Sequence, residues 1–248
     1  MVLGICGAQG SGKSTVAQDL AVRLQKRGTA VARLSIDDIY LTRAKREELA
    51  RRVHPLLATR GVPGTHDLAL GHQVLDELAE GKAALLPRFD KAADDRAAPE
   101  RWVKAPERCA VLLFEGWCVG ARAQSPDQLA APANALEAQE DSDCVWRNYV
   151  NEALAGPYQR LFARLDGLIL LAAPDFETVF DWRMQQERAL RVETRETQGS
   201  DRRIMDEEQI IRFVQHYERL TRHVLAEMPD RADLVFRLDT ARRVVSSA

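Results

Sequence analysis

The segment Gly7–Ser14, G-A-Q-G-S-G-K-S, has the residue types and spacing of a phosphate-binding loop. Its glycines let backbone N–H groups turn toward phosphate oxygens, and the start of the following helix adds the positive end of its dipole. Lys13 can reach the β- and γ-phosphates, and the Ser14 hydroxyl is placed to bind Mg²⁺. A glycine-rich turn without a ligand needs neither residue at these positions. We therefore expect ATP and Mg²⁺ as cofactors, with the nucleotide held by Gly7, Ala8, Gln9, Gly10, Ser11, Gly12, Lys13, Ser14 and Thr15.

Acidic residues follow two other apolar segments. Asp37 and Asp38 come directly after residues 30–36, and Glu115 directly follows residues 110–114. In a phosphoryl-transfer enzyme one carboxylate can accept the proton of the attacking hydroxyl, while another helps to hold Mg²⁺ or to orient the substrate. We expect the first role for Asp37 and the second for Glu115. Helix capping is the alternative role for an Asp that follows a strand, and it stays open for Asp38.

The elements that must position these residues alternate between apolar strands and amphipathic helices. Strands are expected at 2–6, 30–36, 110–114 and 167–172, with 234–236 as the last. Helices are expected from Lys13 to about Lys26, from the cap Asp67 to Gly81, with Pro174 in the first turn of a third, and from Asp206. Residues 87–106 are expected to form a loop over the sheet edge. The pattern predicts the α/β class, a P-loop NTPase fold whose largely parallel sheet has helices on both faces and ligands at the carboxyl ends of its strands.

Length and composition point to one domain with two irregular segments. A chain of 248 residues fits one α/β domain, or one domain with a lid. Residues 121–142 are rich in Ala, Pro, Gln and acidic residues, which suggests a surface insertion. Residues 195–205 contain Gly199-Ser200 and paired arginines, and we expect them to be mobile.

Charge and apolar patterning argue against several classes of partner. The net charge of −2 gives no general attraction to nucleic acid or to an anionic membrane. No stretch approaches eighteen consecutive apolar residues, and a strand that begins at residue 2 leaves no room for a secretory leader. We therefore expect a cytoplasmic protein that acts on a small molecule, in an oligomeric state that the sequence leaves open. The four cysteines have no C-x-x-C spacing and are expected to be buried free thiols.

Several further motifs follow the phosphate-binding loop in order along the chain. They are S-x-D-D-x-Y, R-G-x-x-G-T-H-D-L, P-R-F-D-K with D-D-R, F-E-G-W and W-R-x-Q-x-E-x-x-L-R. Together they resemble those of the D-glycerate 3-kinases, the plant-type glycerate kinases, which are related to uridine kinase, phosphoribulokinase and bacterial-type pantothenate kinase. The loop alone is shared by many unrelated NTPases, so the middle motifs carry the resemblance.

The resemblance implies transfer of the γ-phosphate of ATP to D-glycerate, which gives 3-phospho-D-glycerate. By its place in S-x-D-D-x-Y, Asp37 matches the catalytic base, and a helical lid at 181–205 would bring arginines over the transferred phosphate. The catalytic set is then Asp37, Lys13, Glu115, Arg183 and Arg191, with Arg188 as a further lid cation. The acceptor would be bound by Asp38, Tyr40, Arg60, His66, Asp67, Arg88, Lys91 and Arg96, since guanidinium groups grip carboxylates well.

Other interpretations remain open from the sequence. Asp67 could act only as a helix cap, and His66 could be an ordinary loop histidine. The acceptor could instead be uridine or pantothenate. A nucleotide-binding regulatory module without catalysis is a further alternative, although such a module does not require Asp37, Glu115 and the lid arginines.

Overall fold

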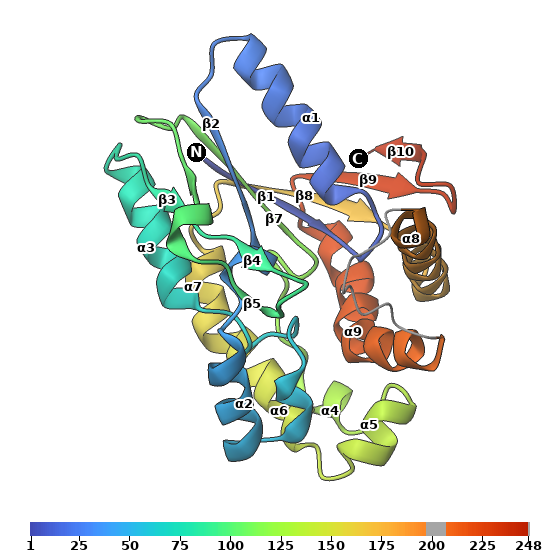
Figure 1. The fold of residues 1–248 in the computed structure, drawn as a ribbon. Helices are drawn as coiled ribbons and strands as arrows, with labels where there is room; N and C mark the ends of the chain where they lie inside the picture. The colour runs from blue at the N-terminus through green and yellow to red at the C-terminus, as the bar shows by residue number, and fades with distance from the viewer. Residues whose placement is uncertain (197–206, 248) are drawn as a thin grey trace.

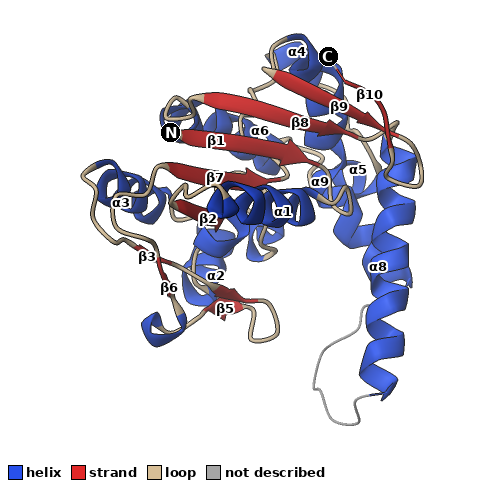
Figure 2. Cartoon of the chain, turned by 90° about the horizontal axis from the view of Figure 1, so that it is seen from above, coloured by secondary structure: helices blue, strands red, loops and turns tan. Residues whose placement is uncertain are grey.

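The computed structural model describes residues 1–196 and 207–247, and side chains are described except at 187–196 and 207. Its main sheet has six strands in the order β10-β9-β8-β1-β7-β2 (Figures 1 and 2). The strands are β1 (Val2–Gly7), β2 (Val31–Ser35), β7 (Val111–Gly116), β8 (Gly167–Ala172), β9 (Leu234–Leu238) and β10 (Val244–Ser247). All neighbouring pairs are parallel except β9 with β10. The predicted α/β fold with a largely parallel sheet is confirmed.

Helices cover both faces of this sheet. Helix α1 packs against β1, β2 and β7 through Ala17 and Ala21, while α3, α7 and α9 cover the opposite face. The helices are α1 (Lys13–Lys26), α2 (Arg43–Arg52), α3 (Leu68–Ala79), α4 (Pro126–Leu129), α5 (Ala135–Glu140), α6 (Val145–Ala153), α7 (Gln159–Phe162), α8 (Phe176–Glu196) and α9 (Glu207–Glu227).

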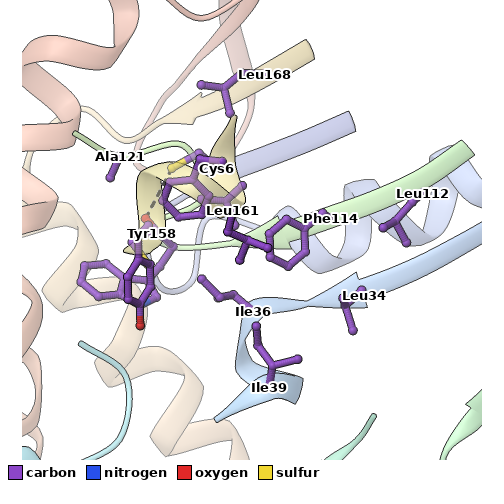
Figure 3. Packing of buried hydrophobic residues seen from close by; sticks show 14 of the residues in the cluster. Cys6, Leu34, Ile36, Ile39, Leu112, Phe114, Ala121, Tyr158, Leu161 and Leu168 are labelled. Atoms are coloured by element: carbon purple, nitrogen blue, oxygen red, sulfur yellow. Dashed lines mark hydrogen bonds between the residues drawn. The ribbon is translucent and has the colours of Figure 1, made fainter. Parts of the chain in front are cut away.

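The largest hydrophobic cluster lies between the sheet and the helices α3, α7 and α9. Phe114 of β7 lies beside Leu161 in Figure 3, and Leu34 of the neighbouring strand β2 and Tyr158 belong to the same cluster. Ile36 is fully buried in the same cluster and begins the short 3-10 helix η1 (Ile36–Ile39). Burial of apolar area of this kind is the main stabilising term in folding. It also fixes where β2 ends, because the buried Ile36 and Ile39 hold Asp37 and Asp38 between them.

Three sequence-based expectations about the elements are wrong. Residues 87–106 are not a plain loop, because the chain there forms two short antiparallel ladders. These pair β3 (Leu85–Leu86) with β6 (Val103–Lys104), and β4 (Phe89–Asp90) with β5 (Asp95–Arg96). Two-residue strands are too short to leave a periodic pattern in the sequence.

The other two errors lie near helix α8 and the C-terminus. Pro174 precedes α8 rather than lying in its first turn, and Asp175 accepts a hydrogen bond from the Thr178 N–H at the helix start. The strand over 234–236 extends to Leu238 and is followed by β10, so it is not the last. Strand β10 is exposed along its whole length, and an edge strand of this kind lacks the apolar pattern of a buried one.

Residues 121–142 form the short helices α4 and α5, and α5 is fastened to α9 by Arg219, whose Nη2 lies 2.6 Å from Glu137 Oε2. Whether this segment is an insertion stays a prediction. Cys6 and Cys118 are buried free thiols as expected, whereas Cys109 and Cys144 are free but only half-buried. Within the described ranges, no helix is long and apolar enough to cross a membrane.

Candidate active site

The loop between β1 and α1 has the backbone geometry of a phosphate cradle. Gly10 and Gly12 have φ values of 80° and 87°, a left-handed conformation that favours glycine. A Cβ at Gly10 would lie 2.6 Å from Cβ of Trp182, so the loop and α8 approach too closely for any side chain there. Arg242 donates from Nε to the Gly10 carbonyl at 2.6 Å and stacks over Trp182. Trp182 and Arg242 therefore hold the loop from other parts of the chain, and the sequence of the loop itself does not predict these contacts.

Glu115 lies directly beside this loop. In the sheet register it stands between Ile5 of β1 and Ser35 of β2, which places it level with the last residue of β2 and near the end of β1. Ser14 Oγ donates to Glu115 Oε1 at 2.8 Å, and the buried Oε2 has no hydrogen-bond partner in the described part of the protein. Mg²⁺ prefers oxygen ligands and keeps several waters and phosphate oxygens in its shell. The unpaired carboxylate oxygen and the neighbouring hydroxyl fit such an ion.

Asp37 projects from η1 toward the same region. Tyr40 donates its hydroxyl to Asp37 Oδ1 at 2.6 Å, and Lys91 Nζ lies 2.8 Å from Oδ2. Burial by itself would raise the pKa of Asp37, but the charges of Lys91 and Lys13 and the two hydrogen bonds outweigh it and hold the pKa well below its usual range. Asp37 is therefore ionised at neutral pH and lies within the electrostatic field of Lys13.

Asp38 points to a different partner. It accepts hydrogen bonds from Arg88 Nη1 at 3.0 Å and from the Phe89 N–H at 3.2 Å, which ties η1 to β4. Burial raises its pKa although Arg88 opposes the shift. Neither Asp37 nor Asp38 caps the short helix, because the Ser35 side chain accepts the Asp37 N–H. The geometry thus separates the two carboxylates, with Asp37 beside the phosphate loop and Asp38 on the β4–β5 ladder.

His66 and Asp67 flank Tyr40. The His66 ring packs on Tyr40 with centroids 4.7 Å apart, and burial lowers the pKa of His66 to about 3, so the ring is neutral. The Tyr158 hydroxyl accepts the Gly64 N–H and contacts His66 Nδ1, so its own proton can serve Nδ1 and the ring proton is assigned to Nε2. That buried Nε2 has no hydrogen-bond partner among the described residues.

Asp67 has the capping role that the sequence allowed, and it also binds an arginine. It accepts the Leu70 N–H at the start of α3, and its Oδ2 accepts from Arg96 Nη2 at 2.9 Å. The same Arg96 nitrogen donates to the Tyr40 carbonyl at 3.0 Å. Asp67 and Arg96 therefore hold α3, β5 and the residue after η1 together.

The R-G-V-P-G-T loop is fastened by aromatic residues from two other elements. Tyr217 of α9 donates to the Arg60 carbonyl at 2.9 Å, and Trp117 donates to the Gly61 carbonyl at 2.9 Å. Gly61 and Gly64 have φ values of 123° and 100°, and a Cβ at Gly61 would lie 2.1 Å from the Tyr217 hydroxyl oxygen. The two glycines of this loop indicated a turn in the sequence, but no pattern predicted that Tyr217 contacts it.

Arg46 and Asp94 form a second group that sequence reasoning missed. Arg46 is buried and donates to the carbonyls of Leu41, Ala58 and Asp94, and its Nη2 lies 3.0 Å from Asp94 Oδ2. The Asp94 carboxylate also accepts from Arg60 Nη1. Because the sequence of α2 is highly charged, it predicts that Arg46 is exposed to solvent, and its buried role could not be recognised from the sequence.

The lid region is described only in part. Arg183 of α8 is half-buried, and its guanidinium lies over the Phe213 ring with its Cζ 5.1 Å from the centroid. The side chains of Arg188 and Arg191, and the residues 197–205, lie outside the described residues. The proposed phosphate contacts of the lid therefore stay predictions.

Comparison with known proteins adds a family to this geometry. Residues 2–122 match the model of the phosphoribulokinase/uridine kinase family. The chain is 36% identical over 226 residues to mug58, an uncharacterized kinase of Schizosaccharomyces pombe, and the match covers 87% of this chain and 78% of the relative. It is 30% identical over 246 residues to the chloroplastic D-glycerate 3-kinase of Arabidopsis thaliana. That match covers 94% of this chain but only 50% of the plant protein.

A solved structure is also similar over the whole length. The D-glycerate 3-kinase of Cryptococcus neoformans superposes with a TM-score of 0.81 at 25% sequence identity. The superposition covers 100% of this chain and 89% of that one.

Proposed function

The chain belongs to the phosphoribulokinase/uridine kinase family and is an ATP-dependent kinase, and from this premise we propose that it phosphorylates D-glycerate at the 3-hydroxyl. The observation that carries the choice of acceptor is the charge around Asp37. Four cationic side chains form ion pairs in this region: Lys91 with Asp37 itself, Arg88 with the neighbouring Asp38, Arg96 with Asp67 and Arg60 with Asp94. A small acceptor with a carboxylate suits such surroundings. Two relatives named as D-glycerate 3-kinases support the same choice.

The donor half of the reaction depends on Lys13, Ser14 and Glu115. Lys13 would place its charge on the β- and γ-phosphates, and the loop N–H groups would bind their oxygens. Ser14 and Glu115 would hold Mg²⁺, which supplies charge neutralisation on the phosphates when bound. Arg183, together with Arg191, would approach the transferred group from the lid.

The acceptor half depends on Asp37. The 3-hydroxyl of glycerate would donate its proton to the Asp37 carboxylate as the hydroxyl oxygen attacks the γ-phosphorus. Phosphoryl transfer has a loose transition state, so a carboxylate of low basicity can still orient the nucleophile and take the proton late. Tyr40 keeps the carboxylate in place, and His66 Nε2, which has no hydrogen-bond partner in the described part of the chain, can donate to a hydroxyl of the acceptor.

Uridine and pantothenate are the alternative acceptors, and a regulatory module without turnover is the alternative class. A coupled assay of ADP release with D-glycerate, uridine, pantothenate and ribulose 5-phosphate separates them. We expect D-glycerate to give the highest kcat/KM. Robust turnover of uridine with none of D-glycerate would replace the proposal with its alternative, and no turnover with any acceptor would favour the regulatory class. The cytoplasmic location stays a prediction, as one relative is named chloroplastic.

A further inference from the structure

Each of the four acceptor-side cations already has a carboxylate partner inside the protein. Arg60 pairs with Asp94, Arg88 with Asp38, and Arg96 with Asp67. Lys91 pairs with Asp37, the residue placed to act on the acceptor hydroxyl. A bound acceptor carboxylate therefore meets cations that are already paired. The four pairs differ in how easily the cation can turn to a second carboxylate.

Lys91 is the cation that can be exchanged most easily. Its side chain is 63% exposed, against 25% for Arg60, 30% for Arg88 and 18% for Arg96. It lies in the turn between β4 and β5, on a flexible stem of four carbons, and carries a compact charge without a fixed fork geometry. The lysine end of the pair is largely solvated whereas the Asp37 side chain is only 28% exposed, so the Lys91 ammonium can turn to a second carboxylate without leaving a buried position.

Tyr40, the second hydrogen-bond partner of Asp37, is buried and held in place, unlike Lys91. Tyr40 is buried between His66 and Phe89, with ring centroids 4.7 Å and 5.1 Å away, and its hydroxyl stays on Asp37 Oδ1. Movement of Lys91 alone therefore frees Oδ2 while Tyr40 keeps the carboxylate oriented.

We propose that Lys91 determines specificity for anionic acceptors by covering Asp37 Oδ2 in the free enzyme and moving to the acceptor carboxylate when a substrate binds. The inference rests on the proposed function, since it takes D-glycerate as the acceptor. An acceptor without a negative charge leaves Lys91 on Asp37, so the hydroxyl meets a carboxylate that is already neutralised.

The chemical step balances without a change in the charge of Lys91. The acceptor O–H proton passes to Asp37 Oδ2, and the hydroxyl oxygen forms a bond to the γ-phosphorus. The bond from the γ-phosphorus to the β,γ-bridging oxygen breaks, and ADP keeps that electron pair. Lys91 stays protonated throughout and changes only the carboxylate that it contacts.

The test compares D-glycerate with methyl D-glycerate, which has the same hydroxyls but no charge. In Lys91→Met we expect the KM for D-glycerate to rise by about 10–100-fold, as for loss of a hydrogen bond to a charged group. We expect kcat/KM for the methyl ester to rise by about tenfold over wild type, because the base is uncovered. Lys104→Met, an exposed lysine on β6, is the matched control and should change neither value.

A second measurement follows Asp37 without any acceptor. A ¹³C NMR titration of its carboxyl, assigned with Asp37→Asn, should show a higher pKa in Lys91→Met than in wild type. If the ester is used no better by Lys91→Met and the Asp37 titration is unchanged, Lys91 does not cover the base and the inference is wrong, even though glycerate turnover stands. If wild type does not use D-glycerate at all, the proposed function fails first, and that result is visible before any variant is made.

Discussion

The two halves of the candidate site are built in different ways. The donor side, Gly7–Ser14 with Glu115, is formed by one loop and the neighbouring strand, and it rests on backbone conformation. The acceptor side joins residues far apart in the sequence through ion pairs: 54 positions separate Lys91 from Asp37, 50 separate Arg88 from Asp38, and 29 separate Arg96 from Asp67. Local geometry can bind a group that all ATP-dependent kinases share. Because the acceptor side depends on long-range ion pairs, substitutions in the loops can change which acceptor is bound.

The largest effect is expected on the donor side. Lys13→Ala removes the charge that stabilises the β- and γ-phosphates, and turnover should fall by about 10³-fold, the upper range for loss of one electrostatic contact. ATP binding should weaken as well, while circular dichroism shows an intact fold. Lys26→Ala, at the exposed end of α1, is the control. Wild-type turnover in Lys13→Ala would break the assignment of the loop.

The next largest effect is expected on the free energy of unfolding, when Arg46 on the acceptor side is replaced. Arg46→Met leaves three carbonyls and Asp94 without their buried donor. Removal of one partner from a buried pair costs about 3–5 kcal/mol, and we expect the lower end because Asp94 is partly exposed. Urea unfolding measures this free energy, with Arg52→Met on the exposed face of α2 as control. A change equal to that of the control would show that Arg46 does not hold the loops.

Replacement of Asp37, the proposed base, should lower the rate without disturbing ATP binding. We expect Asp37→Asn to reduce kcat by about 10²-fold, the low end for a general base, because the transition state is loose. The affinity for ATP should change little. Asp38→Asn should act mainly on KM for the acceptor, since Asp38 anchors Arg88 and the Phe89 N–H. If Asp38→Asn loses more kcat than Asp37→Asn, the roles of the two residues are reversed.

The smallest effect is expected on the Mg²⁺ requirement, when Glu115 on the donor side is replaced. Glu115→Gln keeps the hydrogen-bonding shape beside Ser14 but removes a charge that Mg²⁺ would use. The Mg²⁺ concentration for half-maximal activity should rise by about tenfold, within the range seen when a group that tunes a metal site is changed. A titration of activity with Mg²⁺ at fixed ATP measures it. An unchanged titration would remove Glu115 from the metal site.

The same contrast explains how much could be predicted from the sequence. The phosphate loop, its helix from Lys13 to Lys26 and the position of Glu115 at the end of β7 follow from spacing within a few residues. The sequence motifs also predict the role of Asp37 and the residues that bind the acceptor, and these stay predictions. The sequence did not indicate that Tyr217, Arg46 and Arg242 support the loops, because each acts from a distant element through a contact that has no local pattern.

The identity of the reaction is tested most directly by the product. D-glycerate labelled with ¹³C at carbon 3 is incubated with ATP, Mg²⁺ and the purified protein, and the product is examined by ¹³C and ³¹P NMR. We expect a two-bond coupling between the labelled carbon and the phosphorus, together with one ADP for each product formed. Phosphate attached to carbon 2, or ADP release without any phosphorylated glycerate, would contradict the proposed function.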